Sequence, residues 1–222
     1  MNVEGNITDI RKRIDAALER ADRHNEVRIV AVAKGVEIPI IKKAIAAGIN
    51  SIGENRVQEA EEKKNMIEED VSWHMIGHLQ SNKARLAASI FDWVHSVDTL
   101  KLASRLNTMC ADLDKKLNIL IQVNISGEKT KAGAREETLK PLIEHINKLP
   151  HLKLMGLMTM APHYENPEET RPVFRELLRL KNLYSLPYIS MGMTNDFEVA
   201  VEEGANIVRI GRAIFGEKKE AK

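Results

Sequence analysis

The sequence predicts a single-domain α/β protein, a (β/α)₈ TIM barrel. Short apolar runs alternate along the chain with amphipathic helical stretches, and eight such runs can be counted, each but the last followed by a clear helix. The runs are apolar throughout, as parallel strands are when helices cover them. With 222 residues the chain lies near the lower limit for this fold, so one domain spanning 1–222 is predicted. An open doubly wound sheet is the competing architecture.

The elements follow from the apolar periods, taken in order. An amphipathic helix is predicted over 8–23, with Ile10, Ile14 and Leu18 on one face. Strands are predicted at 27–33, 50–53, 73–76, 93–96, 117–124, 152–158, 188–191 and 207–210. Helices are predicted at 38–47, 56–69, 81–89, 99–113, 136–148, 168–184 and 196–203. The last helix is expected to be short or missing, with the first helix covering the gap, and the charged tail 217–222 is expected to fray.

The composition excludes several function classes. The 33 Lys and Arg residues balance 32 Asp and Glu residues, a net charge of +1, which argues against a nucleic-acid surface and shows no polybasic membrane signal. The single cysteine, Cys110, excludes an intrachain disulfide framework and a cysteine-cluster zinc site. No apolar run reaches the roughly 18 residues of a membrane span, and the first residues are too polar for a signal peptide. A cytoplasmic protein is expected, with a monomer preferred.

Lys34 is the most informative single residue. It ends the apolar run 28–33, where an active-site face would lie in a barrel. Burial there would disfavour the ammonium and favour the neutral, nucleophilic amine, which forms Schiff bases with carbonyls. The alternative is a lysine that leaves the strand and extends into water.

Two loops after the seventh and eighth strands predict a phosphate site. In 190–197, small and hydroxylic residues precede a helix that begins near Thr194, and exposed N–H groups at such a start favour a phosphate. In 208–216, Gly211 ends the eighth strand and permits close approach of the backbone to a ligand. Phosphate sites after strands 7 and 8 recur in barrels. An ordinary glycine turn is the alternative for either loop alone.

Arg209 and Asn55 add to this site. By alternation Arg209 shares a face with Ile207 and Gly211, and inside a barrel its guanidinium needs an acceptor, either a structural carboxylate or a ligand. A phosphate-bearing cofactor that needs a lysine and accepts an arginine at its ring nitrogen is pyridoxal 5'-phosphate (PLP). Asn55, at the end of the second strand, would lie beside Lys34 and bond a ring hydroxyl, or would cap the next helix.

No metal site is expected. His74 and His78 stand four apart, but a strand and a glycine lie between them, which spoils a helical pair of ligands. No carboxylate stands at a suitable spacing.

At this point the chain resembles the family of pyridoxal phosphate homeostasis proteins, the single-domain relatives of the N-terminal barrel of alanine racemase. The matching segments occur in order along nearly the whole chain: 31–34, 52–59, 73–83, 155–162, 190–197, 208–211 and 214–216. The resemblance implies that Lys34 carries PLP as an internal aldimine, that Arg209 faces the pyridine nitrogen and that Asn55 lies near the cofactor. It implies a phosphate site made by Ser190, Thr194, Gly211 and Arg212.

The chain departs from the family pattern at three positions. Ala33 and Gly35 stand where hydroxyl residues generally flank the lysine, and Arg212 stands where a smaller residue is common. The first two departures remove possible hydrogen bonds near the cofactor. They bear on affinity for PLP and leave the covalent link itself possible.

The resemblance implies a binding protein that holds PLP on Lys34, buffers it and delivers it to PLP-dependent apo-enzymes, without catalytic residues of its own. An arginine at the ring nitrogen disfavours its protonation, which makes the ring a weak electron sink. The alternatives are a PLP-dependent amino-acid racemase or lyase, and a cofactor-free Schiff-base aldolase. A racemase needs a further acid/base group, and none of the three tyrosines, Tyr164, Tyr184 and Tyr188, matches a known position for one.

Overall fold

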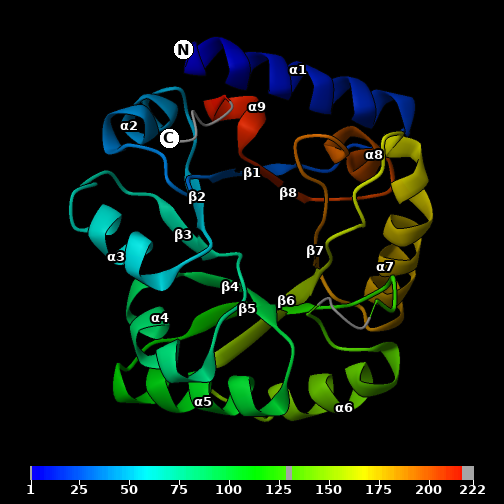
Figure 1. Ribbon diagram of the computed structural model, residues 1–222. Helices are drawn as coiled ribbons and strands as arrows, with labels where there is room; N and C mark the ends of the chain where they lie inside the picture. The colour runs from blue at the N-terminus through cyan, green and yellow to red at the C-terminus, as the bar shows by residue number, and fades with distance from the viewer. Residues whose placement is uncertain (1, 129–131, 217–222) are drawn as a thin grey trace.

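The strands close into a parallel barrel in chain order, with β8 pairing back to β1 (Figure 1). The computed structural model describes residues 2–128 and 132–216. The strands are β1 (Arg28–Val32), β2 (Ser51–Glu54), β3 (Ser72–Met75), β4 (Trp93–Val97), β5 (Leu117–Gln122), β6 (Leu152–Met158), β7 (Tyr188–Ser190) and β8 (Ile207–Ile210). This confirms the predicted barrel and excludes the open sheet. All eight predicted strands are present, two of them with the predicted bounds.

Helices surround the barrel in the order that the sequence predicts. They are α1 (Val3–Arg20), α2 (Ile38–Ala46), α3 (Val57–Lys64), α4 (Ala84–Ile90), α5 (Leu100–Asp112), α6 (Glu136–Ile146), α7 (Arg171–Leu183), α8 (Phe197–Glu202) and the short α9 (Arg212–Phe215). The 3₁₀ turns η1 (Ser81–Lys83) and η2 (Pro167–Thr170) precede α4 and α7.

Several helix boundaries differ from the prediction, and three of them have a clear local reason. α1 begins five residues earlier than the predicted 8, because the side chain of Asn2 caps it by accepting from Gly5 N–H at 2.9 Å. α3 ends at Lys64 rather than 69, because the chain turns after Asn65 and buries Ile67. α7 begins at Arg171, where Pro172 occupies the first turn, a position that suits proline.

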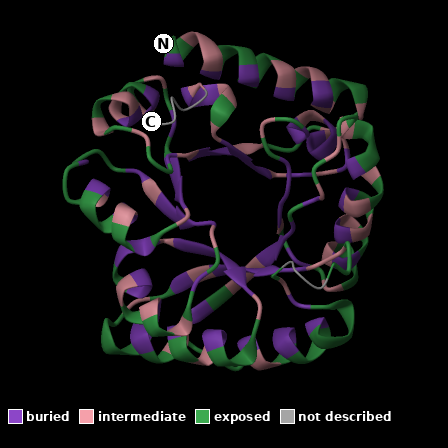
Figure 2. Ribbon diagram, in the orientation of Figure 1, coloured by how far each residue is buried: buried purple, intermediate pink, exposed green. Residues whose placement is uncertain are grey.

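The barrel has two apolar regions, one outside its wall and one inside. The larger core lies between the strands and the inner faces of the helices, whose outer faces are exposed (Figure 2). The smaller cluster fills the barrel and contains Val30, Ile76, Trp93, Leu120, Met158 and Ile207. Buried polar side chains lie on or directly after the same strands, among them His95, Gln122, Thr159, Ser190 and Arg209. A barrel interior with this many buried polar groups is a candidate for a functional site.

α1 covers the side of the barrel where α9 is short, as predicted (Figure 1). Asn6 Nδ2 donates to the carbonyl of Ile214 at 2.9 Å, and Arg13 forms an ion pair with Glu198 of α8 at 2.6 Å. The first helix therefore closes the wall beside the first and last strands.

No helix among the described residues is long and apolar enough to cross a membrane. The predicted fraying of 217–222 lies outside the described residues, and the single domain spanning 1–222 stays a prediction.

Candidate functional site

Lys34 lies on the rim of the barrel, just beyond β1. The strand ends at Val32, and a tight turn over 33–36 follows, closed by a hydrogen bond from Val36 N–H to the Ala33 carbonyl at 2.9 Å. This turn lifts Lys34 out of the wall, so its side chain is exposed, with no hydrogen bond or ion pair to any described residue. The expectation that Lys34 is buried and desolvated is therefore wrong for this structure. The amine is free to meet a ligand.

The same turn favours a glycine at position 35. Its φ is +57°, a left-handed conformation that glycine adopts without a steric penalty. Its N–H donates to Glu59 Oε2 at 3.2 Å. The turn therefore explains the absence of a hydroxyl residue at this position.

Replacing Gly35 by alanine is expected to lower the free energy of unfolding by about 1 kcal/mol, because a Cβ in the left-handed region is strained. Urea unfolding measures this loss. Gly127→Ala is the matched control, since Gly127 has a φ of +69° and an added Cβ there would meet nothing within 4 Å. Both variants should lose stability, and only Gly35→Ala should change the reactivity of Lys34. An unchanged reactivity of Lys34 would show that the turn does not set its position.

A cavity of about 250 Å³ opens at the carboxyl ends of β7 and β8. Its lining includes the predicted site residues Thr194, Arg209, Gly211 and Arg212. The carboxylate-bearing Asp196, which was not predicted, lines it as well. Val32 also lines it, two residues before Lys34. Thr194 Oγ1 accepts from Ala213 N–H at 3.4 Å, which brings the two loops together. The structure thus unites Thr194, Arg209, Gly211 and Arg212, as the sequence predicts, whereas Lys34 and Asn55 follow β1 and β2 on the neighbouring rim and do not line this cavity.

Arg209 lies on the inner face with Ile207, as alternation predicts, and only 4% of it is exposed. Its acceptors are uncharged: Nη1 donates to Ser190 Oγ at 2.7 Å and Nη2 to the Thr159 carbonyl at 2.8 Å. Burial lowers the pKa of Arg209 to about 10, and the nearby Asp196 carboxylate opposes this shift. The alternative that Arg209 forms an ion pair with a structural carboxylate is therefore wrong, since its hydrogen-bond acceptors are a hydroxyl and a carbonyl.

Ser190 lies beneath the cavity and not in its lining. Its hydroxyl is fully buried, and His95 Nδ1 lies 3.1 Å from Ser190 Oγ. Behind it, His95 Nε2 lies 2.9 Å from His74 Nδ1. A chain of polar contacts therefore runs through the barrel from His74 to His95, Ser190 and Arg209.

The donor of each hydrogen bond between these four residues can be assigned by counting their protons and acceptor atoms. Arg209 must donate, so Ser190 Oγ is left to donate to His95 Nδ1; His95 Nε2–H then donates to His74 Nδ1. Among the side-chain atoms of these four residues, His74 Nε2 is the buried one that has no hydrogen-bond partner in the described part of the structure. In the reverse arrangement His74 donates to His95 and His95 donates to Ser190, so the Ser190 hydroxyl proton would also lack an acceptor. We therefore assign the arrangement in which Ser190 donates to His95.

Both histidines are neutral at physiological pH. Burial and, to a smaller extent, the charge of Arg28 lower the pKa of His74 to about 3. Burial, the neighbouring His74 and Arg209 hold the pKa of His95 well below its usual range. Sequence reasoning missed this pair, having weighed His74 only with His78; the apolar strand setting of His95 was the available signal.

Asn55 is half-buried at the end of β2, and its amide makes no hydrogen bond within the described part of the chain. The alternative that it caps the next helix is wrong, because the cap residue of α3 is Arg56. A Cβ on Gly77 would lie 2.5 Å from the Asn55 carbonyl oxygen, so the glycine lets the two loops meet.

Asp196 is a second residue that sequence reasoning did not single out. It is buried in the cavity wall, and its Oδ1 accepts from Met193 N–H at 2.6 Å, which shapes the loop before α8. Burial raises the pKa of this carboxyl group, while the Met193 bond and Arg209 oppose the rise.

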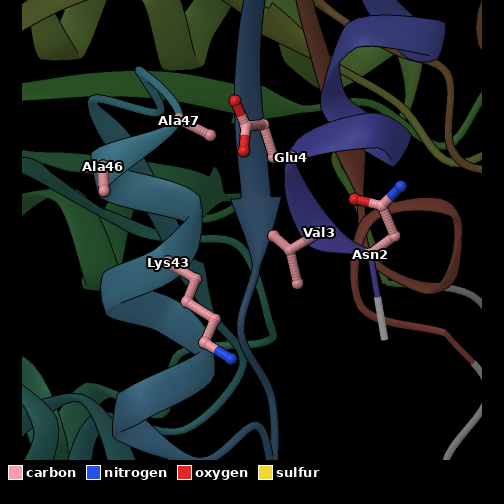
Figure 3. A pocket seen from close by; sticks show the side chains of 6 residues that line it. All are labelled: Asn2, Val3, Glu4, Lys43, Ala46 and Ala47. Carbon is pink, nitrogen blue, oxygen red and sulfur yellow. The ribbon is translucent and has the colours of Figure 1, made fainter.

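A separate cavity of about 320 Å³ lies between the first turn of α1 and the end of α2 (Figure 3). Its lining is Asn2, Val3, Glu4, Lys43, Ala46 and Ala47. None of these residues belongs to the strand ends, and it is not part of the candidate site.

Comparisons with known proteins identify the family of this chain. Residues 6–219 match the family model described as alanine racemase, N-terminal domain. The chain is 40% identical to the pyridoxal phosphate homeostasis protein of Aquifex aeolicus, over 99% of this chain and 100% of that protein. It is 41% identical to the Haemophilus influenzae protein of the same name, over 97% of this chain and 96% of that protein.

A solved structure is similar along the same length. PipY of Synechococcus elongatus PCC7942, solved with PLP bound, superposes with a TM-score of 0.86 at 32% identity, covering 96% of this chain and 100% of that chain. The resemblance predicted from the motifs is confirmed: the chain belongs to the pyridoxal phosphate homeostasis protein family, built on the alanine racemase N-terminal barrel.

Proposed function

We propose that this chain binds PLP covalently through Lys34 and serves as a carrier that buffers the cofactor and delivers it to PLP-dependent apo-enzymes. One observation carries the proposal. Lys34 carries a free amine two residues beyond Val32, and Val32 lines the cavity that also presents Arg209, Thr194 and Gly211. PipY, which shares the fold and 32% of the sequence, was solved with PLP bound.

The residues present fit the cofactor. Thr194 Oγ1, the Arg212 guanidinium and the main-chain N–H of Arg212 suit a phosphate, since this first N–H of α9 donates to no described residue. Asn55, with an unused amide, suits the ring hydroxyl. Arg209 suits the ring nitrogen. Ser190, fully buried, is proposed to act through Arg209 and not to touch the phosphate.

When bound, PLP would supply an aldehyde, and Lys34 would supply the amine that holds it covalently. A guanidinium beside the ring nitrogen opposes protonation there, which weakens the electron-withdrawing power that amino-acid chemistry needs. The positive charge stays on the Arg209 guanidinium, whose orientation is fixed by its hydrogen bonds to Ser190 and to the Thr159 carbonyl. This supports a carrier over an enzyme. We propose that the carrier acts as a monomer.

A racemase remains the second candidate because of one observation. Tyr164 and His163 line the same cavity, from the loop after β6, and either could serve as an acid/base group. Deuterium exchange at the α-carbon of alanine, well above the rate with free PLP and lost in Tyr164→Phe, would favour that candidate over the carrier.

The proposed function is tested by an absorbance spectrum of the purified protein with added PLP, before and after borohydride reduction, followed by peptide mapping. We expect a visible band that reduction converts to a stable adduct on Lys34. A protein that stays colourless and acquires no adduct would overturn the proposal, and turnover of an aldehyde or ketol substrate without PLP would then support the aldolase.

Arg209→Gln is expected to weaken PLP binding by about tenfold or more, since a charged hydrogen-bond donor contributes about 1.5–3 kcal/mol. It should also shift the pH titration of the bound chromophore. Arg28→Gln is the control, because Arg28 lies at the other end of β1, over the Trp93 ring at 5.3 Å. Identical spectra of the Arg209 variant and wild type across pH would show that Arg209 is structural.

A further inference from the structure

Three charged side chains hold the main chain on both sides of Lys34. Lys63 Nζ donates to the carbonyl of Ala33 at 2.7 Å, and Gly35 N–H donates to Glu59 Oε2 at 3.2 Å. Lys63 Nζ also donates to Glu54 Oε1 at 2.5 Å. We call Glu54, Glu59 and Lys63 the α3 clamp, because two of them lie on α3 and the third ends β2.

Burying the charges of the α3 clamp costs desolvation free energy, and a gain in stability alone does not account for their presence there. Glu54 is fully buried and Lys63 is 8% exposed. Desolvation of such a pair offsets much of its attraction, so a buried ion pair is weak evidence for a stabilising role. Besides Glu54, the Lys63 ammonium donates a hydrogen bond to a main-chain carbonyl, and that carbonyl belongs to the residue directly before Lys34.

The peptide groups around Lys34 are fixed while its side chain is free. Ala33 N–H donates to the Gly53 carbonyl at 2.9 Å, and the Ala33 carbonyl accepts from both Lys63 and Val36. Gly35 N–H is held by Glu59. A fixed main chain that carries a free amine suits a nucleophile that must reach one point in space, because fixing its position beforehand lowers the entropy lost on reaction.

The clamp also joins the two neighbouring strand ends. Glu59 and Lys63 stand four apart and so share one face of α3, with Lys63 Nζ 3.8 Å from Glu59 Oε2. Glu54 directly precedes Asn55 at the end of β2. The position of Lys34 is thereby tied to that of Asn55, which is assigned to the ring hydroxyl.

We propose that Glu54, Glu59 and Lys63 are positioning residues for Lys34, which hold its main chain so that the amine meets a cofactor aldehyde whose phosphate lies at the ends of β7 and β8. The proposal rests on the proposed PLP-binding function.

The test measures PLP binding by the variants, through the rate of appearance of the visible band, its apparent Kd and the fraction of Lys34 trapped by borohydride. Glu59→Ala removes the acceptor for Gly35 N–H and should weaken binding about fivefold, the worth of one hydrogen bond. Glu59→Gln keeps an oxygen acceptor and should restore binding and the wild-type spectrum.

Lys63 is tested together with Glu54, so that no unpaired charge stays buried. The double variant Glu54→Gln/Lys63→Met should weaken binding about tenfold or more and lower the fraction of adduct on Lys34. Lys64→Met is the matched control: Lys64 is the next residue of the same helix, and its Nζ donates to the Ile90 carbonyl, away from Lys34.

Two outcomes would contradict these expectations, and they are distinguishable. If wild type forms the adduct on Lys34, and Glu59→Ala and the double variant bind PLP with the Kd, rate and spectrum of Lys64→Met, the clamp is only structural and the inference is overturned. If wild type itself forms no adduct on Lys34, the proposed function is wrong, and the positioning role of the α3 clamp is overturned together with it. Glu59→Ala keeps the test decisive if the double variant does not fold.

Discussion

Lys34→Ala is expected to abolish the visible PLP band and the borohydride-stable adduct, while leaving the free energy of unfolding within about 0.5 kcal/mol of wild type. The amine is the only part of Lys34 that the proposed chemistry uses. Because the side chain is exposed and contacts no described residue by hydrogen bond or ion pair, its removal leaves no cavity and no unpaired group. Absorbance after PLP addition, peptide mapping after reduction and urea unfolding measure the three quantities.

Lys83→Ala is the control for this variant. Lys83 ends η1, near the third strand, and belongs to the motif shared with the family. It should retain the band and the adduct. A reducible adduct on Lys83 in the Lys34→Ala protein, formed at the wild-type rate, would show that the site was assigned to the wrong lysine.

Acid should destabilise the protein through its two buried histidines. Each has a folded-state pKa far below the value near 6.5 that it takes in the unfolded chain, about 3 for His74. Below pH 6.5 the unfolded state therefore binds protons that the folded state does not, so the free energy of unfolding falls as pH falls. For His74 the slope approaches about 1.4 kcal/mol per pH unit, or about 2 kcal/mol by pH 5, and His95 acts in the same direction.

His74→Phe separates this effect from the buried carboxyl groups. Burial raises the pKa of Glu54, Asp98 and Asp196, which contribute to the acid response of wild type and variant alike. Phenylalanine keeps a ring against Trp93, on which His74 stacks at 5.6 Å, but binds no proton. Urea unfolding between pH 7 and pH 5 should show a shallower slope for His74→Phe, whereas His24→Gln, at an exposed histidine, should keep the wild-type slope. Equal slopes for wild type and His74→Phe would show that His74 is charged in the folded state.

Strand order and most of the cavity were predictable from the sequence, because both follow from local pattern. Apolar runs give the strands, and the residues after the seventh and eighth runs meet since parallel strands end at one face. Thr194, Arg209 and Gly211 were found in this way, Arg212 was implied by the family resemblance, and the structure brings all four together.

The contacts across the barrel were not predictable. His95 and Ser190 stand 95 residues apart, and they touch only because β4 and β7 face one another inside a closed barrel. Lys63 appeared in the sequence as one charge on a polar helix, with no sign that it reaches the Ala33 carbonyl. The exposure of Lys34 depends on the strand ending at Val32, and strand ends shift by a residue or two without changing the pattern.

The pairing of β8 with β1 has a consequence for the newly made chain. The ribosome releases Lys34 early, but its counterpart Arg209 and the turn at Gly211 emerge only near the end of synthesis. Until β8 docks between β1 and β7, the Lys34 amine belongs to a chain in which the cavity at the ends of β7 and β8 has not formed. If that cavity holds the phosphate as proposed, loading with PLP is a property of the finished barrel.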